Sequence, residues 1–256
     1  MEKLLENKTL LIAGAGGLLG ALLVSKVIEQ GGKVIAADIN QKEMRERFKS
    51  LGIDVENEYL TLENLDITDE KNVKEFFLKY SDIDGAVNST YPRNKTYGSH
   101  FFDVSLESFN ENLSLHLGGA FLFTQQCANY FKKSGNPFSL VNISSIYGVI
   151  APKFEIYDNT TMTMPVEYAA IKSAIQHITK YTVAYINDSR FRINCVSPGG
   201  IIDQQPDCFL QAYKEKTHGV GMLDVKDVVG SVLFLLSEQS RYITGQNIII
   251  DDGFSL

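Results

Sequence analysis

Cysteine is scarce in this chain of 256 residues and occurs only at Cys127, Cys195 and Cys208. The number is odd, and the spacing matches neither a metal site nor a disulfide framework. Free cysteines without such a framework are typical of a reducing compartment. We therefore expect a cytoplasmic protein without a metal site, in which each cysteine packs as a small buried hydrophobic side chain.

Long apolar runs and excess positive charge are also missing. The apolar run at 232–236 stops well short of the ~18 residues that a membrane span needs. The start Met1-Glu-Lys has no apolar run, so we expect no signal peptide. The net charge of -7 argues against nucleic acid or an anionic membrane as partner, because both require clustered positive charge. With 44% hydrophobic residues and no linker, the chain predicts one soluble domain over 1–256.

The first 38 residues predict a strand, a helix and a second strand. The apolar run 8–13 is followed by Gly14-Ala-Gly-Gly17-Leu-Leu-Gly20, which opens a helix that ends at Gly31, and 33–38 is the second strand. Gly14 permits a tight turn, Gly17 a close approach of phosphates, and Gly20 close packing of helix on strand. Such a turn at a helix N-terminus binds pyrophosphate, although a purely structural turn would look similar.

Asp38 ends the second predicted strand, eighteen residues beyond Gly20. A carboxylate at this place accepts hydrogen bonds from a ribose 2′-hydroxyl and repels a 2′-phosphate. The next residues, Ile39 and Asn40, offer no positive charge. Asp38 therefore favours NAD over NADP, and the alternative is an ordinary loop aspartate beside a helix cap at Asn40.

The alternation of strands and helices continues along the chain. We expect strands ending near Asp66-Ile67 and at Asn88, helices over about 70–80 and 105–133, and further strands at 138–143, 190–196 and 246–251. This pattern predicts a three-layer α/β fold with a doubly wound parallel sheet. Asp66, Ile67 and Asn88 would then lie at the carboxyl edge of the sheet, where cofactors bind.

Tyr168 and Lys172 are four residues apart in a predicted helix and therefore share one face. A free tyrosine has a pKa near ~10, and a nearby ammonium group favours the phenolate and lowers this value. The predicted strand 138–143 leads to Ser145, whose hydroxyl can bind the reacting oxygen. The three residues predict general acid/base chemistry with Tyr168 as the proton donor or acceptor.

A second tyrosine and lysine, Tyr91 and Lys95, have the same spacing. Pro92 places them in a loop, where that spacing does not align side chains, so we do not expect a catalytic pair. Arg93 and Lys95 could contact an anionic substrate or be solvated surface charges. The stretch 201–222 has no clear period and suits a mobile substrate lid.

Taken in order, these motifs resemble the short-chain dehydrogenase/reductase family over nearly the whole chain. The resemblance also includes Ser197-Pro198-Gly199 and Tyr242-Ile-Thr-Gly-Gln246. It implies a Rossmann-type fold, catalysis by Ser145, Tyr168 and Lys172, and a homotetramer or homodimer. It further implies that Lys172 holds the nicotinamide ribose and depresses the pKa of Tyr168. The implied NAD-binding residues are Gly14, Gly17, Leu18, Leu19, Gly20, Asp38, Asp66, Ile67, Asn88, Tyr168, Lys172, Pro198, Gly199 and Ile201.

The chain departs from the family pattern in its glycine spacing and at three further places. Asn88-Ser-Thr-Tyr91 replaces a smaller loop and narrows the space beside the nicotinamide. His116 stands where the family has a catalytic asparagine that holds a water in the proton path. A neutral imidazole could replace it and would titrate near pH ~6–7, and the alternative is an ordinary packed or capped histidine.

The third difference is the long interval of 23 positions between Ser145 and Tyr168. Its insertion, 150–165, is expected to arch over the substrate. This stretch resembles oxidoreductases of bacterial flagellin-modification and nonulosonate-sugar pathways of the legionaminic-acid type. The resemblance implies a phosphorylated or amino sugar as substrate, whereas a merely structural insertion would imply nothing about it.

The sequence is also compatible with two other functions. The glycine spacing also occurs in sugar epimerases and dehydratases that retain NAD, although the chain looks too short for their added substrate domain. The changed loop at Asn88 and the histidine at 116 would suit a catalytically silent dinucleotide sensor. The intact Ser145, Tyr168 and Lys172 argue against a silent protein.

Overall fold

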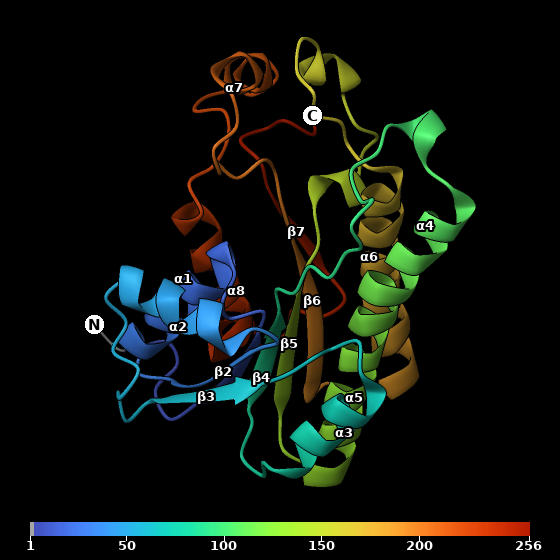
Figure 1. Cartoon of the computed structure of the whole chain (residues 1–256). Helices are drawn as coiled ribbons and strands as arrows, with labels where there is room; N and C mark the ends of the chain where they lie inside the picture. The colour runs from blue at the N-terminus through green and yellow to red at the C-terminus, as the bar shows by residue number, and fades with distance from the viewer. Residues whose placement is uncertain (1–2) are drawn as a thin grey trace.

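A computed structural model describes residues 3–256 and shows a seven-stranded parallel sheet with helices on both faces (Figure 1). The strand order is β3-β2-β1-β4-β5-β6-β7, and every pairing is parallel. The strands are β1 (Thr9–Ala13), β2 (Lys33–Asp38), β3 (Leu60–Asn64), β4 (Gly85–Asn88), β5 (Phe138–Ile143), β6 (Phe191–Pro198) and β7 (Asn247–Ile250). The predicted doubly wound α/β fold is therefore confirmed.

Two hydrophobic cores lie on the two faces of this sheet. Helices α1 (Leu18–Glu29), α2 (Gln41–Ser50) and α8 (Lys226–Leu236) cover one face. Helices α3 (Glu70–Leu78), α5 (Gly119–Ser134) and α6 (Val166–Ile186) cover the other. Because both faces are covered, the central strands β1, β2, β4 and β5 are mostly buried and apolar, whereas the edge strand β3 is more polar and more exposed.

Side-chain caps define the helix starts that the sequence indicated. The Asn40 side chain accepts a hydrogen bond from the amide of Glu43 at the start of α2. Asp69 accepts from two amides in the first turn of α3. Each cap satisfies amide groups that have no partner inside the helix, so these short polar residues fix where the helices begin.

The predicted helix at 105–133 is continuous but not uniform. It begins as α4 (Leu106–Asn112), widens into a π-helical turn over Leu113–Gly118, and continues as α5. The hydrophobic period did not indicate this wider turn. A π-turn inside an α-helix often marks a functional site, and His116 lies within it.

The stretch 201–222 contains helix α7 (Asp207–Lys214), in which Phe209 and Tyr213 are buried. Its role as a substrate lid stays a prediction, whereas the expected burial of Cys208 is wrong. Cys208, in the same helix, is exposed, whereas Cys127 and Cys195 are buried as expected. In α7 one face alone packs inward, and Cys208 lies off that face.

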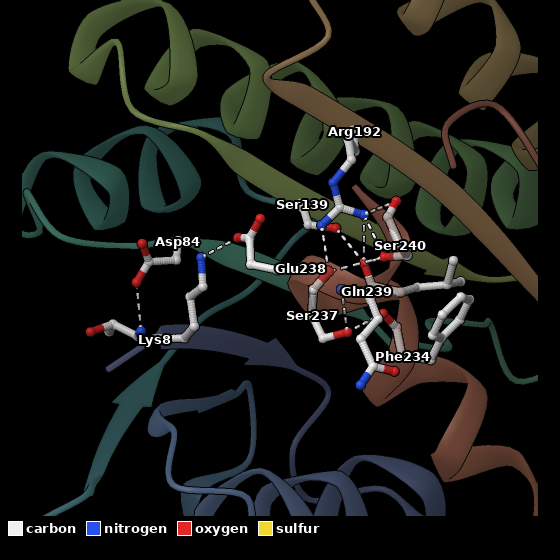
Figure 2. A network of polar contacts seen from close by, with 11 residues as sticks. Lys8, Asp84, Ser139, Arg192, Phe234, Ser237, Glu238, Gln239 and Ser240 are labelled. Carbon is white, nitrogen blue, oxygen red and sulfur yellow. Dashed lines mark hydrogen bonds and ion pairs between the residues drawn. The ribbon is translucent and has the colours of Figure 1, made fainter. Parts of the chain in front are cut away.

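The polar network in Figure 2 closes the end of the sheet opposite the carboxyl ends of its strands. Arg192, near the start of β6, is buried, and its guanidinium donates to the carbonyl oxygens of Leu235, Ser237 and Ser240. Nearby, the ammonium group of Lys8 pairs with Glu238 at 2.7 Å. The guanidinium thus adds charge-assisted hydrogen bonds to carbonyl groups at and just after the end of α8, which also accept from the hydroxyl groups of Ser139 and Ser240 and from the amide of Ile243.

We expect Arg192→Met to lower the free energy of unfolding by about 2–4 kcal/mol, because several buried carbonyl groups lose charge-assisted hydrogen bonds. Denaturant unfolding measures this change. The KM for NADH should stay the same, since Arg192 is far from the carboxyl edge. An unfolding midpoint equal to that of the unsubstituted protein would show that water replaces the guanidinium.

Within 3–256, no helix is both long and apolar enough to cross a membrane. The same residues contain no cluster of three or more His, Cys, Asp or Glu side chains arranged to hold a metal ion.

Candidate active site

The segments that follow β1, β2, β4, β5 and β6 meet at the carboxyl edge of the sheet (Figure 1). The registers place Ala13 beside both Ala37 and Asn88, and Asn142 beside Cys195. Strand order reverses between β1 and β4, so a crevice opens at this point, as in other open α/β sheets. The predicted site residues come from these segments and from α6.

The glycine turn after β1 has the geometry expected of a pyrophosphate site. Gly14 has φ +80°, and a side chain there would approach the backbone of Ser89 and Thr90 at 2.9 Å. A methyl group at Gly20 would overlap the carbonyl oxygen of Gly14. Gly17, the N-cap of α1, is less crowded, but an added Cβ would still lie 3.3 Å from the carbonyl oxygen of Gly14, which is a tight contact.

The first turn of α1 is free to bind an anion. Among residues 3–256, the backbone amides of Leu18, Leu19 and Gly20 donate to no acceptor. The turn also contains no acidic residue. Free amides at the positive end of a helix dipole fit the pyrophosphate of a dinucleotide, so these residues fit NAD.

Asp38 lies at the end of β2, beside the glycine turn. Its carboxylate accepts hydrogen bonds from the amide of Gly16 at 2.9 Å and from that of Asn40 at 3.0 Å. These bonds fix the carboxylate where the ribose of a dinucleotide would lie. The arrangement fits NAD, and the negative charge of Asp38 would repel the 2′-phosphate of NADP.

We expect Asp38→Ala to raise the Kd for NADH about 10-fold, because hydrogen bonds from the ribose to a charged group are lost. The Kd for NADPH should fall, since a negative charge is removed. Fluorescence titration of both cofactors checks this. Asn40→Ala is the matched control. An equal change in Kd for NADH and NADPH would contradict a role of Asp38 in the choice between the two cofactors.

Three other predicted cofactor residues stabilise the turns after β3 and β4. Asp66 accepts from the amide and hydroxyl of Thr68, and Asn88 accepts from those of Thr90. Ile67 is buried and packs against Gly119, where an added Cβ would lie 2.9 Å from its side chain. They lie at the expected edge, and their contact with NAD stays a prediction.

A cavity of about 450 Å³ lies beside the glycine turn. The predicted residues Leu19, Ser145, Tyr168, Lys172, Pro198, Gly199 and Ile201 line it. Its outer wall comes from the insertion and from the 201–222 stretch, through Tyr157, Met162, Met164, Phe209 and Met222. The structure therefore brings Ser145, Tyr168 and Lys172 and the two candidate substrate segments into one cavity, whereas His116 does not line it.

Lys172 lies one helical turn beyond Tyr168 on α6 and is buried. Its ammonium group donates to the carbonyl oxygen of Ile143 at 2.9 Å. Burial lowers the pKa of Lys172 to about 8, because desolvation disfavours the charged form. Lys172 is thus within reach of proton exchange near neutral pH.

Tyr168 differs from expectation in its electrostatics. Burial raises the pKa of Tyr168, and the neighbouring Ser145 hydroxyl acts in the opposite direction. The expected lowering by Lys172 is wrong for the protein without cofactor, because desolvation of the phenolate is the dominant influence and Lys172 is not among the groups that lower this pKa. Tyr168 is therefore a protonated hydroxyl in this state.

His116 is buried in the π-helical turn, and its Nδ1 has no hydrogen-bond partner among residues 3–256. Burial, followed by the positive charges of Lys172 and Arg93, lowers the pKa of His116 to about 2. The expectation that it titrates near pH 6–7 is therefore wrong. The imidazole is neutral at physiological pH, and its Nδ1 can still form a hydrogen bond.

Sequence reasoning missed the position of Tyr91. Its ring is perpendicular to that of Tyr168 at 5.7 Å between centroids and contacts the ring of His116 at 5.2 Å. Its hydroxyl donates to Tyr97 at 2.5 Å. Tyr91 is in a loop, as predicted, and does not form a catalytic pair with Lys95, but it links His116 to the cavity. The unusual Asn88-Ser-Thr-Tyr91 sequence was the signal for this contact.

Free helix amides, a carboxylate at the end of the second strand and a tyrosine–lysine pair, all at the carboxyl edge of a parallel sheet, define an NAD-dependent oxidoreductase of the Rossmann type. Comparisons with known proteins agree. The family described as enoyl-(acyl carrier protein) reductase matches residues 15–255. The chain belongs to the short-chain dehydrogenase/reductase family.

Two relatives with known names bear on the chemistry and on the substrate. Post-translational flagellin modification protein A of Campylobacter coli is 40% identical over 99% of this chain and 100% of its own length. The 7alpha-hydroxysteroid dehydrogenase of Bacteroides fragilis is 29% identical over 98% of this chain and 95% of its own. One relative is named for flagellin modification and the other for a steroid substrate. Similarity to both indicates the class of chemistry and leaves the substrate of this chain open.

A solved structure is similar over nearly the full length. The short-chain dehydrogenase from Leptospira borgpetersenii, crystallised with bound NAD+, has a TM-score of 0.86 and is 34% identical. The match covers 98% of this chain and 94% of that one. Together with the glycine turn and Asp38, this supports NAD as the cofactor.

Proposed function

We propose that the protein transfers a hydride between NAD and a carbinol or carbonyl carbon of a phosphorylated or amino sugar in surface-glycan biosynthesis for flagellin modification. The observation that carries the pathway is the 40% identity, over the whole of both chains, to a protein named for flagellin modification. The cavity supports a sugar, since it combines many hydroxyl groups with aromatic and methionine side chains.

The described residues suit the proton half of this reaction, and NAD when bound supplies or accepts the hydride. The Tyr168 hydroxyl gives a proton to the carbonyl oxygen in reduction and takes it back in oxidation. Ser145 hydrogen-bonds the same oxygen and orients it. Lys172 holds the ribose and, with a pKa near 8, returns a proton to Tyr168.

The proposed cofactor residues are those at the carboxyl edge. Gly14, Gly17, Leu18, Leu19 and Gly20 hold the pyrophosphate through backbone groups. Around the rest of the dinucleotide we place Asp38, Asp66, Ile67, Asn88, Tyr168, Lys172, Pro198, Gly199 and Ile201.

His116 is proposed as a neutral member of the proton path, reached through Tyr91. We expect His116→Phe to lower kcat by up to ~100-fold, at the low end of general acid/base effects, and His116→Asn to stay within a few-fold. Because burial lowers the pKa of His116 to about 2, the pH–rate profile of His116→Asn should keep both limbs. Equal activity of His116→Phe and the unsubstituted protein would remove His116 from the path.

The 201–222 stretch and the 150–165 insertion are proposed to act together as a substrate lid. The rings of Tyr157 and Phe209 pack at 5.1 Å, and Lys216 pairs with Glu155 at 3.0 Å. Figure 1 shows α7 and the neighbouring turn beyond one end of the sheet. Limited proteolysis tests the lid: cleavage within 201–222 should slow when NADH and substrate are bound, and an unchanged rate would contradict it.

Self-association is proposed through the outer face of α5 and α6. Phe121, Tyr181 and Tyr185 on this face are 50%, 64% and 69% exposed and border a hollow. Apolar surface of this kind is typical of contacts between copies, so we propose a homodimer or homotetramer in the cytoplasm. Sedimentation velocity that shows only monomer would contradict this proposal.

The experiment that tests the proposed function begins with NAD and NADP titration and continues with a panel of phosphorylated and amino sugars. Absorbance of reduced nicotinamide reports hydride transfer. Turnover of one sugar class with NADH is the expected result. Sugar conversion without net change in reduced nicotinamide would instead indicate an NAD-retaining epimerase or dehydratase, and cofactor binding without any turnover would contradict the proposal.

A further inference from the structure

Arg93 is a positively charged side chain without a partner beside the cavity. Its guanidinium lies over the ring of Tyr91, 4.8 Å from the centroid. No ion pair or side-chain hydrogen bond within 3–256 includes Arg93, and its side chain is exposed. Tyr91 itself lines the cavity and contacts the ring of Tyr168. A free guanidinium is therefore stacked on a wall of the site.

The loop that carries Arg93 is held firmly. Asn94 donates from its backbone amide to Asn112 at 3.0 Å, and the Asn112 side chain donates back to Asn94 at 3.1 Å. Asn112 is fully buried and also donates to Glu167, the residue directly before Tyr168. These bonds tie the position after Arg93 to the start of the catalytic helix, so the backbone that carries the guanidinium keeps its place relative to Tyr168.

The cavity itself offers little charge. Its lining contains no carboxylate, and Lys172 is its one charged side chain. Lys172 already donates to Ile143 and is assigned above to the cofactor ribose. A cationic amine would therefore find no carboxylate in the cavity lining, whereas an anionic group would find the guanidinium of Arg93 beside the cavity.

We propose that Arg93 binds the phosphate of a sugar phosphomonoester whose uncharged ring occupies the cavity. This rests on the proposed function and selects the phosphorylated class from its two candidates. A guanidinium binds phosphate through two parallel hydrogen bonds, and stacking on Tyr91 orients this fork. The ring hydroxyl groups of the sugar meet the tyrosine and serine hydroxyls, and its apolar faces meet aromatic rings.

The test compares Arg93→Met with Lys95→Met in the NADH-loaded protein. Lys95 is an exposed cation two residues away on the same loop, so it is a matched control for net charge. Phosphorus NMR titration uses inorganic phosphate and the 6-phosphates of glucose, fructose, mannose and glucosamine. Glucose and glucuronate, read by ligand-observed proton NMR, serve as the neutral and carboxylate counterparts.

For at least one 6-phosphate, Arg93→Met should raise Kd about 10- to 100-fold, the loss expected for a charge-assisted hydrogen-bonded contact. Lys95→Met should stay within about twofold, and binding of glucose should be the same in all three proteins. Arg93→Lys should recover part of the loss, because it restores charge without the fork.

Equal Kd values in Arg93→Met and the unsubstituted protein, or equal losses in both methionine variants, would overturn the assignment. So would the absence of detectable binding by every phosphate. Tighter binding of glucuronate than of the phosphates would replace the phosphate by a carboxylate and overturn the class. These outcomes are read from binding alone, so they are distinct from a failure of hydride transfer, which nicotinamide absorbance reports.

Discussion

Replacing Tyr168 by phenylalanine should lower kcat by at least ~10³-fold, within the range that a general acid/base contributes. The ring remains, and its packing against Tyr91 at 5.7 Å is kept, while the hydroxyl that exchanges the proton is lost. The cavity keeps its shape, so the Kd for NADH should stay within about twofold. Stopped-flow absorbance of reduced nicotinamide and fluorescence titration give the two quantities.

Ser145→Ala is the companion of this variant. The Ser145 hydroxyl lowers the pKa of Tyr168 and is proposed to orient the substrate oxygen. Its removal should therefore reduce kcat with NADH binding unchanged, and by less than the loss of the phenol. Turnover by Tyr168→Phe at the rate of the unsubstituted protein would contradict the proposed mechanism.

Replacing Lys172 by methionine should lower kcat by ~10²-fold or more and also raise the Kd for NADH, since one group serves proton return and ribose binding. The loss of both turnover and NADH binding would distinguish the role of Lys172 from that of Tyr168, whose substitution should lower turnover alone. Methionine fills a similar volume, so the fold should survive. Steady-state kinetics over pH 6–9 measures the effect, and unchanged NADH binding would contradict the ribose contact.

The same substitution should change the pH dependence of stability. The pKa of Lys172 is about 8 in the folded protein and 10.5 ordinarily. Between these values the unfolded chain binds more protons, so the free energy of unfolding rises with pH through this window. Below pH 8 both states are protonated, and the folded state carries the full cost of burying the charge. Lys172→Met should lose this rise, which denaturant unfolding at several pH values detects.

The sequence predicted the parts of the fold that depend on local pattern. Apolar runs ending in Asp38 and Asn88 gave the strands, and capping residues such as Asn40 gave the helix starts. The four-residue spacing of Tyr168 and Lys172 needs only helix geometry, so their shared face was accessible from the sequence. The order of these motifs along the chain then indicated the family.

Features set by tertiary burial were not accessible. Neither the π-turn around His116 nor its strongly lowered pKa is visible in a hydrophobic period, because both come from packing against distant segments. The contact of Tyr91 with Tyr168 joins a loop and a helix far apart in sequence. The exposure of Cys208 depends on which face of α7 packs inward.

The most direct test of the central claim follows one deuterium atom. NADH labelled with deuterium at the transferable position of C4 is incubated with the protein and the carbonyl forms of the phosphorylated sugars, and mass spectrometry follows the label. The account predicts deuterium on the new carbinol carbon of one sugar phosphate, with none transferred by Tyr168→Phe. Label that remains on the nicotinamide with every sugar would contradict hydride transfer as the function of this protein.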